Sequence, residues 1–197
     1  MAAEQTKNIC LTSRFEEALI YAVRLHKSQT RKGTEIPYIA HLLGVAALVL
    51  EDGGGEDDAV AALLHDAVED QGGLETLEEI RARFGRRVAT IVEGLTDTYV
   101  KPKPPWRKRK LQYITHLKNA TDEVRQVSLA DKLHNARAIL ATLREEGDNT
   151  WNRFTGGKAG TLWYYRTLVT VFRQGGSDFM SEELERVVSQ IEELTAP

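Results

Sequence analysis

The spacing of apolar residues is the feature that most restricts the fold of this chain. From Phe15 onward, apolar side chains recur every three or four positions, and the same spacing returns over residues 39–51, 57–70 and 76–84. This period places them on one face of an α-helix, whereas the alternation of apolar and polar residues that marks a half-buried strand is not evident. The sequence therefore predicts an all-α fold, a bundle of about eight or nine helices.

Capping and turn residues indicate where several of these helices begin and end. Thr76 and Glu79 match a capping box at the start of one helix, and Gly85 is typical of a helix end. The stretch KPKPP cannot continue a helix, so a loop should precede a basic helix over residues 106–119. Thr121 can cap the long helix that follows, and two more helices are expected after it.

The length of the chain favours a single hydrophobic core. At 197 residues it is long enough for one well-buried domain and short for two. Residues 1–12 begin with the polar stretch MAAEQTKN and are expected to form a flexible N-terminus. Residues 13–197 are therefore expected to form one helical domain.

Composition and charge argue against several classes of protein. The longest apolar run, from Leu42 to Leu50, is much shorter than the roughly 20 residues that cross a bilayer, and the N-terminal stretch lacks a signal-peptide core. We therefore expect a cytoplasmic protein. A net charge of −3 argues against a general nucleic-acid binder, although it is compatible with a basic pocket for a small anion. The single cysteine, Cys10, excludes an internal disulfide.

The stretch ALLHDAVED carries many polar groups for an apolar segment. It holds one histidine and three carboxylates within six positions: His65, Asp66, Glu69 and Asp70. At about 100° per residue, these side chains fall in one broad sector of an α-helix. Because unpaired carboxylates are costly inside a protein, a positive charge should meet them there. Either they form one side of a metal site, or they are acids that cluster by chance at a solvated helix end.

Two further residues are candidates for the same site because of where they lie. His41 opens the apolar helix LLGVAALVL, and Asp131 lies in the apolar segment VSLADKLHNAR, with Asn135 one turn further along the same face. Taken singly, such a histidine is more often a satisfied core residue, and such an aspartate is more often paired with a lysine or arginine. Together with His65 and Asp66 they would offer two nitrogen and two oxygen ligands, which suit Mn²⁺, Fe²⁺ or Zn²⁺.

Five motifs follow one another along the chain. They are RKGTEIPYIAH, ALLHDAVED, FGRRVATIVEGLTD, PPWRKRK and SLADKLHNAR, across about residues 14–143. With its H…HD…D pattern, the chain resembles the HD-domain phosphohydrolases, all-α metal enzymes that cleave phosphate esters. The order of the motifs is similar to that in the hydrolase domain of RelA/SpoT homologues and in the stand-alone small alarmone hydrolases of the metazoan SpoT homologue type. The resemblance implies that residues 13–197 form an HD-type hydrolase domain.

Carried over residue by residue, the resemblance implies two sets of side chains at a reaction centre. The set that would bind a divalent metal, Mn²⁺ first with Fe²⁺ or Zn²⁺ as alternatives, is His41, His65, Asp66 and Asp131. Glu69 and Asp70 would be the catalytic acid pair, about one turn further along, where they can orient the attacking water or take its proton. The alternative for this pair is exposed charge at a helix end.

The resemblance also implies residues that hold the substrate. These are Arg31, Lys32, Lys103, Asn135 and Tyr164. Arg31 and Lys32 would contact the nucleotide base and its surroundings, and Lys103 would reach a phosphate. Asn135 would hydrogen-bond the ribose or a phosphate, and Tyr164 would line the nucleotide pocket, although aromatic residues at helical spacing are more often core. Most other basic residues of KPKPPWRKRK are expected to face water.

The activity implied by the resemblance is hydrolysis of guanosine tetra- or pentaphosphate at the 3′ position, which gives GDP or GTP and pyrophosphate. The expected partner is thus a small nucleotide, with no membrane and no nucleic acid. Two departures from the family pattern, Leu42 in place of a proline and the Gly156-Gly157 loop, leave the substrate open. The alternatives are an HD phosphohydrolase acting on adenosine alarmones, NADPH or another nucleotide, a nucleotide sensor without turnover, and an RNA-binding module supported only by KPKPPWRKRK.

Overall fold

The computed structural model describes residues 10–98, 102–174 and 179–196, and within these ranges the chain is all-α. The helices are α1 (Ser13–Leu25), α2 (Ile39–Glu51), α3 (Glu56–Leu64), α4 (Leu74–Phe84), α5 (Arg86–Leu95), α6 (Trp106–Leu117), α7 (Asp122–Glu146), α8 (Gly157–Arg173) and α9 (Phe179–Thr195). A π-helical turn, η1 (Val68–Gly72), and a 3₁₀ turn, η2 (Gly147–Arg153), join some of them. The predicted fold class and helix number are confirmed.

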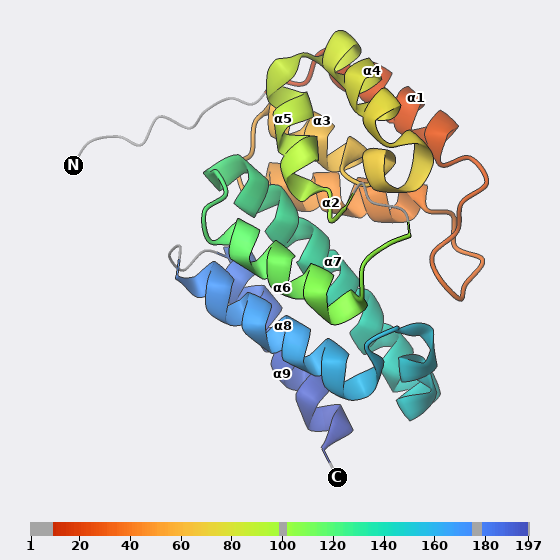
Figure 1. Cartoon of the computed structure of the whole chain (residues 1–197), viewed down its shortest axis with the longest axis vertical. Helices are drawn as coiled ribbons and strands as arrows, with labels where there is room; N and C mark the ends of the chain where they lie inside the picture. Colours follow the sequence, from red (N-terminus) through yellow and green to blue (C-terminus); the bar gives the residue numbers. More distant parts are fainter. Residues whose placement is uncertain (1–9, 99–101, 175–178, 197) are drawn as a thin grey trace.

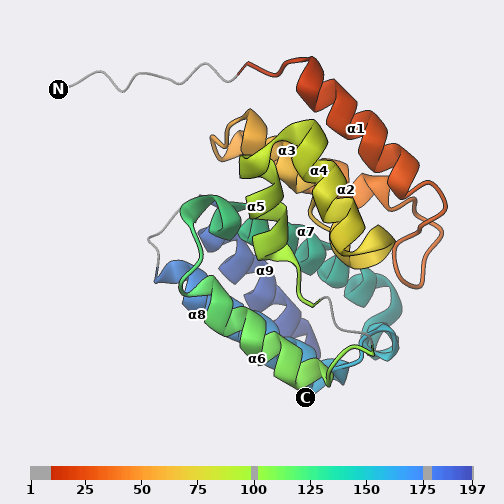
Figure 2. The ribbon, with the colours of Figure 1, turned by 45° about the horizontal axis from the view of Figure 1, so that its top comes forward.

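Helix α7 forms the middle of the molecule. Figure 1 shows α1 to α5 gathered on one side of it and α6, α8 and α9 on the other, and Figure 2 shows the same division from a second direction. Because both groups pack on α7, its apolar residues are buried around much of its circumference, as Leu129, Leu133 and Leu140 illustrate. Burying each such leucine contributes roughly 1.5–3 kcal/mol. A site built on α7 therefore lies between the two groups.

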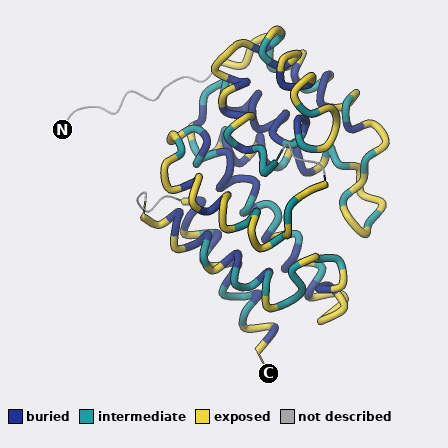
Figure 3. Tube along the Cα trace, viewed as in Figure 1, coloured by how far each residue is buried: buried dark blue, intermediate teal, exposed yellow. Residues whose placement is uncertain are grey.

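Helices α2 and α3 supply the most buried part of the core. Figure 3 shows α3 as largely dark blue and α2 as dark blue in part, and Val45, Val49 and Leu64 have no exposed surface. Polar side chains on these helices must therefore find partners inside the protein. His41 on α2, 1% exposed, and His65 at the end of α3, 3% exposed, are such residues.

The prediction of one helix over residues 57–70 was wrong, because the helix is interrupted at the residues of the candidate site. Helix α3 ends at Leu64, and a turn leads into η1. In η1 the N–H of Gly73 donates to the carbonyl oxygen of Val68, five residues back, at 2.9 Å. Gly73 has φ +63°, which favours glycine. Such wide turns recur at functional sites because they redirect the side chains that follow.

Other predicted boundaries met different outcomes. Thr121 caps α7 by accepting a hydrogen bond from the N–H of Val124 at 3.5 Å, and Gly85 follows the end of α4, so both predictions are confirmed. The capping box of Thr76 was wrong, because α4 already begins at Leu74 and leaves Thr76 buried inside the helix. Gly72 and Gly73 end the π-helical turn, and α4 begins directly after them, two residues before the position that the capping box indicated.

The core links all the helices. One hydrophobic cluster of buried side chains includes residues from each of α1 to α9. The flexible segment predicted for residues 1–12 lies largely outside the described residues, which begin at Cys10, and the domain limits stay a prediction. Among the helices of the described ranges, none has both the length and the apolar content that crossing a membrane requires.

Candidate metal centre and active site

Two histidines and two aspartates meet where α2, the end of α3 and α7 pack together. Nε2 of His41 lies 3.2 Å from Oδ1 of Asp131 and 3.7 Å from Oδ2 of Asp66. Nε2 of His65 lies 3.0 Å from Oδ2 of Asp66 and 3.7 Å from Oδ1 of Asp131. Residues far apart in the sequence are thus brought together by the packing of α2 and α3 on α7. We call these four residues the histidine–aspartate cluster.

The outer nitrogen of each histidine is tethered, which leaves the inner nitrogen facing the cluster. Nδ1 of His65 donates to the carbonyl oxygen of Ala62 at 2.8 Å. Nδ1 of His41 lies 3.0 Å from Nδ1 of His134 on α7. Both Nε2 atoms are buried and have no hydrogen-bond partner among the described residues. A buried nitrogen without a partner is costly, whereas a histidine held through its other nitrogen is the usual arrangement of a metal ligand.

Each aspartate of the cluster is held by further hydrogen bonds. Tyr38 donates its hydroxyl proton to Oδ2 of Asp66 at 2.6 Å. Asp131 accepts hydrogen bonds from the ammonium group of Lys132 and the amide of Asn135. Burial acts to raise the pKa of Asp131, but the charge of Lys132 and the two histidines hold that pKa well below its usual range. The carboxylate is therefore charged and fixed in orientation.

The cluster has the donor set of a divalent-metal site. Ligand atoms of His41, His65 and Asp66 lie within 4.8 Å of one another, and Oδ1 of Asp131 faces both histidine nitrogens. Two imidazole nitrogens and two carboxylate oxygens suit a borderline or hard divalent ion. The two Nε2 atoms without partners are the observation that fits these residues to a metal ion.

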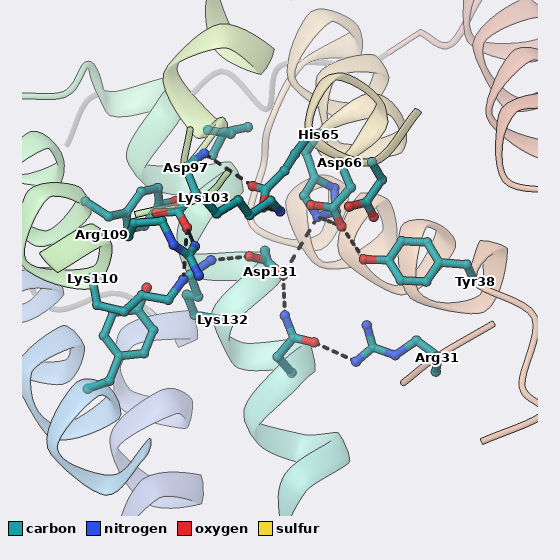
Figure 4. A pocket seen from close by; sticks show the side chains of 16 residues that line it. Arg31, Tyr38, His65, Asp66, Asp97, Lys103, Arg109, Lys110, Asp131 and Lys132 are labelled. Atoms are coloured by element: carbon teal, nitrogen blue, oxygen red, sulfur yellow. Dashed lines mark hydrogen bonds and ion pairs between the residues drawn. The ribbon is translucent and has the colours of Figure 1, made fainter. Parts of the chain in front are cut away.

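The two expected catalytic acids line a cavity of about 280 Å³ beside the cluster (Figure 4). Oε1 of Glu69 accepts a hydrogen bond from Nζ of Lys103 at 2.6 Å, and Oε2 accepts from the backbone N–H of Asp97 at 3.4 Å. Oδ2 of Asp70 accepts from the side-chain amide of Gln29 at 2.7 Å. Partial burial and the charge of neighbouring carboxylates raise the pKa of Asp70. The acid pair is thus held from outside the cluster by three segments of the chain.

Besides Arg31, four cations line this cavity, and Figure 4 shows them close to the cluster and the acid pair, where Lys132 pairs with Asp131 and Lys103 with Glu69. We call them the basic wall: Lys103, Arg109, Lys110 and Lys132. Asp97, 8% exposed at its side chain, pairs with Arg109 and lies 3.5 Å from Nζ of Lys110. Burial and the charge of Lys132 lower the pKa of Lys110. The wall therefore concentrates positive charge next to the candidate metal site.

The structure corrects one expectation about the segment KPKPPWRKRK. Arg107 and Lys108 are exposed, as predicted, but Arg109 and Lys110 line the cavity. They do so because the face of α6 that carries them packs toward α8, and Lys110 lies over the ring of Tyr164 at 5.2 Å from its centroid. Lys101 lies outside the described residues.

A second cavity of about 600 Å³ adjoins the first. Arg31, Asn135 and Tyr164 line both cavities, and Lys32 lines the larger one. The guanidinium of Arg31 donates to Oδ1 of Asn135 at 2.6 Å, which links the loop before α2 to α7. The residues expected to hold substrate are thus gathered around these two connected spaces, and Lys103 lines the smaller one.

One wall of the larger cavity depends on small residues at the start of α8. The indole of Trp106 on α6 lies against Gly156 and Gly160, where an added Cβ would come within 2.8 and 3.2 Å of the ring. The same indole meets the ring of Tyr164 edge-on at 6.2 Å between centroids. The glycine loop, whose role the sequence leaves open, therefore makes room for this tryptophan.

Comparison with known proteins agrees with the geometry. The family model described as the HD domain matches residues 18–162. This chain belongs to the HD-domain family. The matched part of this HD domain contains the whole histidine–aspartate cluster, the acid pair and the basic wall.

Relatives of this HD domain include enzymes named for the reaction that they catalyse. It is 45% identical over 126 residues to the guanosine-3′,5′-bis(diphosphate) 3′-pyrophosphohydrolase MESH1 of Xenopus tropicalis, a match that covers 62% of this chain and 68% of the relative. It is 35% identical over 151 residues to the guanosine-3′,5′-bis(diphosphate) 3′-pyrophosphohydrolase of Aquifex aeolicus, a match that covers 77% of this chain and 18% of that protein.

The fold of this HD domain also matches a solved structure. That structure is described as a metazoan ortholog of SpoT that hydrolyzes ppGpp and plays a role in starvation responses. The two share a TM-score of 0.74 and 25% sequence identity, and the match covers 92% of this chain and 97% of the other. The predicted relationship to RelA/SpoT hydrolase domains and metazoan SpoT homologues is confirmed.

Sequence reasoning missed several polar residues of this HD-domain site. Tyr38 and Lys132 bind the cluster aspartates, and Asp97 binds the basic wall. A signal existed for all three, since Tyr38, Asp97 and Lys132 lie within the quoted motifs RKGTEIPYIAH, FGRRVATIVEGLTD and SLADKLHNAR. No local signal marked Gln29, because its contact with Asp70 joins residues 41 positions apart.

Proposed function

We propose that this protein removes pyrophosphate from the 3′ position of guanosine tetra- or pentaphosphate, giving GDP or GTP. The observation that carries the proposal is one cavity in which a divalent-metal donor set, two carboxylates and several lysine and arginine side chains lie together. Such a site suits a highly charged phosphate ester attacked by water. The HD-domain relatives named as 3′-pyrophosphohydrolases support the same reaction.

We assign metal binding to the histidine–aspartate cluster and propose Mn²⁺ as the ion, with Fe²⁺ or Zn²⁺ as alternatives. The two Nε2 atoms without partners and the two fixed carboxylates support this assignment. A bound divalent ion of this kind lowers the pKa of the water that it binds and shields the negative charge of phosphate oxygens. The tethers at Ala62 and His134 hold the histidine rings so that both Nε2 atoms are free to bind.

The acid pair has the chemistry to activate water. Glu69 and Asp70 hold the attacking water through their carboxylate oxygens, and the proton of that water passes to a carboxylate. The new bond joins the water oxygen to the phosphorus on the ribose 3′ oxygen, and the bond between that phosphorus and the 3′ oxygen breaks. The 3′ oxygen takes up a proton, and pyrophosphate leaves. The raised pKa of Asp70 makes its carboxylate a better base than an ordinary aspartate.

The rest of the nucleotide has a place in the same arrangement. We propose that the larger cavity takes the nucleoside, where Arg31 and Lys32 contact the base and its surroundings. Asn135 hydrogen-bonds the ribose or a phosphate, and Tyr164 lines the pocket. Lys103 exchanges its present partner, Glu69, for a phosphate oxygen when substrate arrives.

Product analysis tests the proposal directly. Purified protein with Mn²⁺ is incubated with guanosine tetraphosphate, guanosine pentaphosphate, the corresponding adenosine compounds and NADPH, and the products are identified. We expect GDP or GTP and pyrophosphate from the guanosine compounds. If only the adenosine compounds or NADPH are turned over, the proposed guanosine substrate is wrong. If nucleotide binds but is not turned over, the protein is a nucleotide sensor and not an enzyme. Parallel assays with Fe²⁺ and Zn²⁺ identify the ion.

A further inference from the structure

A chain of hydrogen bonds runs from the end of α1 to the acid pair, and the reaction proposed above does not use it. It joins His26 to Gln29 and Gln29 to Asp70. We propose that Gln29 is a positioning residue, which holds Asp70 through one carboxylate oxygen and leaves the other free for the attacking water. This inference rests on the proposed hydrolysis and adds Gln29 to the residues that act in it.

The backbone of Gln29 is fixed on both sides. Its N–H donates to the carbonyl oxygen of His26 at 3.0 Å, and its carbonyl oxygen accepts from the N–H of Tyr38 at 2.9 Å. Residues 26–38 thus form a loop whose two ends are tied together, with a bridge between Thr30 and Pro37 inside it. The side chain of Gln29 therefore starts from a rigid base beside η1.

The amide of Gln29 has one orientation that satisfies its neighbours. Its oxygen accepts from Nε2 of Gln71 at 2.6 Å and lies 2.7 Å from Nδ1 of His26. Its nitrogen is then left to donate to Oδ2 of Asp70 at 2.7 Å. A flipped amide would place its oxygen against a carboxylate and its N–H groups against the side-chain amide NH₂ of Gln71. The contacts on the oxygen thus determine that a donor faces Asp70.

His26 supports this orientation from a buried position. It is 3% exposed, and its ring stacks on the ring of Tyr38 at 5.3 Å between centroids with 19° between the planes. When Nδ1 carries the proton, it donates to the oxygen of Gln29. Tyr38 also donates to Asp66. The stacked rings of His26 and Tyr38 therefore support a cluster aspartate through Tyr38 and, through Gln29, an acid of the pair.

The two acids of the pair are held by partners of different charge. Glu69 is bound by the ammonium group of Lys103, whereas Asp70 is bound by the neutral amide of Gln29. A cation next to a carboxylate weakens it as a base more than a neutral donor does. Gln29 therefore fixes the direction of Asp70 and leaves most of its basicity in place, which is what a proton-accepting group needs.

The test replaces the amide by a side chain of similar length that cannot hydrogen-bond. Gln29→Met should lower kcat about tenfold, a part of the roughly 10²-fold contribution of the base itself, with KM changed less than about twofold. Mn²⁺ content should match the wild type, because no cluster residue is changed. Gln126→Met is the matched control: its amide also donates to a carboxylate, Asp52, at 2.8 Å, but far from the cavity, and its kcat should stay unchanged.

A double-mutant cycle separates positioning from a general structural role. In an Asp70→Ala background, Gln29→Met should change kcat less than about twofold, because the group that Gln29 positions is gone. An undiminished tenfold loss in that background, an unchanged kcat in the single variant, or loss of Mn²⁺ from it would each overturn the inference. If the wild-type protein does not turn over guanosine tetraphosphate, both the proposed function and the role of Gln29 are overturned. If the wild type is active and Gln29→Met is equally active, only the positioning role is overturned.

Discussion

The histidine–aspartate cluster and the basic wall line one cavity and meet where Lys132 pairs with Asp131, but they are built in opposite ways. The cluster joins His41 on α2, His65 and the partly buried Asp66 directly after α3, and Asp131 on α7. Its two Nε2 atoms have no hydrogen-bond partner within the described ranges. The wall comes mostly from one short segment, and its cations already bind carboxylates such as Asp97 and Glu69. The cluster is thus rigid and incomplete, whereas the wall is paired and can exchange its partners for phosphate oxygens.

The largest effect is expected from breaking the cluster. Asp131→Ala removes a proposed oxygen ligand and leaves the largely buried Lys132 without its carboxylate. Metal affinity should fall by at least about 10²-fold, since the loss of even an outer-shell partner costs 10–100-fold, and activity should fall with it. Mn²⁺ titration and turnover measure both, and Asp148→Ala, an exposed aspartate outside the cavity, is the control. Undiminished Mn²⁺ affinity would contradict the ligand assignment.

The next effect concerns the acid pair beside the cluster. Glu69→Gln and Asp70→Asn keep size but remove the charges proposed to orient and deprotonate water, so each should lower kcat by about 10² while KM changes little. Metal content should stay near the wild-type value. Glu75→Gln, on the exposed surface of α4, should be fully active. If metal is lost instead, the changed residue is a ligand, and full activity in both variants would refute the catalytic role.

A smaller effect is expected from the basic wall, and it should fall on binding. We expect Lys110 to make one charge-assisted contact to a phosphate of the substrate. Lys110→Met removes that contact, which is worth roughly tenfold, so KM should rise about tenfold with kcat nearly unchanged. Lys108→Met is the matched control, because Lys108 lies on the same helix but is exposed and does not line the cavity. A fall in kcat with constant KM would place Lys110 with the reacting groups instead.

The smallest effect concerns His134, which contacts the cluster residue His41, and the pH dependence of stability. Burial and the charges of His41 and Arg31 lower the pKa of His134 to about 4. Because the folded protein disfavours protonated His134, stability should be lost as the pH falls below the unfolded value of about 6.5, and the loss should reach about 1 kcal/mol by pH 5. Above pH 6.5 this residue should have no such effect.

Urea unfolding of chelator-treated protein at pH 7 and pH 5 measures this difference. His134→Gln should lose less stability on acidification than the wild type, and His116→Gln, at an exposed position of α6, serves as the control for removing a histidine. Equal losses in wild type and His134→Gln would show that another group is responsible.

The comparison also shows which parts of the molecule can be predicted from sequence. Periodicity predicted the helices because each helix must bury one face, and the cluster residues stood out because they interrupt apolar stretches, as His65 and Asp131 do. The direction of Lys110 was missed because it depends on where α6 packs. Helical spacing from Trp106 to Tyr113, both turned inward, held a signal for it, since Lys110 lies between them on the same face.

The parts that could not be predicted depend on long-range packing or on small backbone changes. The contact between Gln29 and Asp70 needs the loop before α2 to lie against η1, and no local pattern reports that. The π-helical turn differs from an α-helix by one residue in the hydrogen-bond spacing, and the sequence VEDQG carries no side-chain signal for that difference. Both features lie beside the acid pair.

The position of Trp106 gives the protein an optical reporter of its own. Of the three tryptophans in the chain, Trp106 lines the larger cavity, and its indole meets Tyr164 there. A purine that enters this space comes within stacking range of the indole, so its arrival should quench intrinsic fluorescence. Nucleotide affinity can then be titrated by emission in variants with slowed turnover, such as Glu69→Gln, and association can be followed in real time with no label attached.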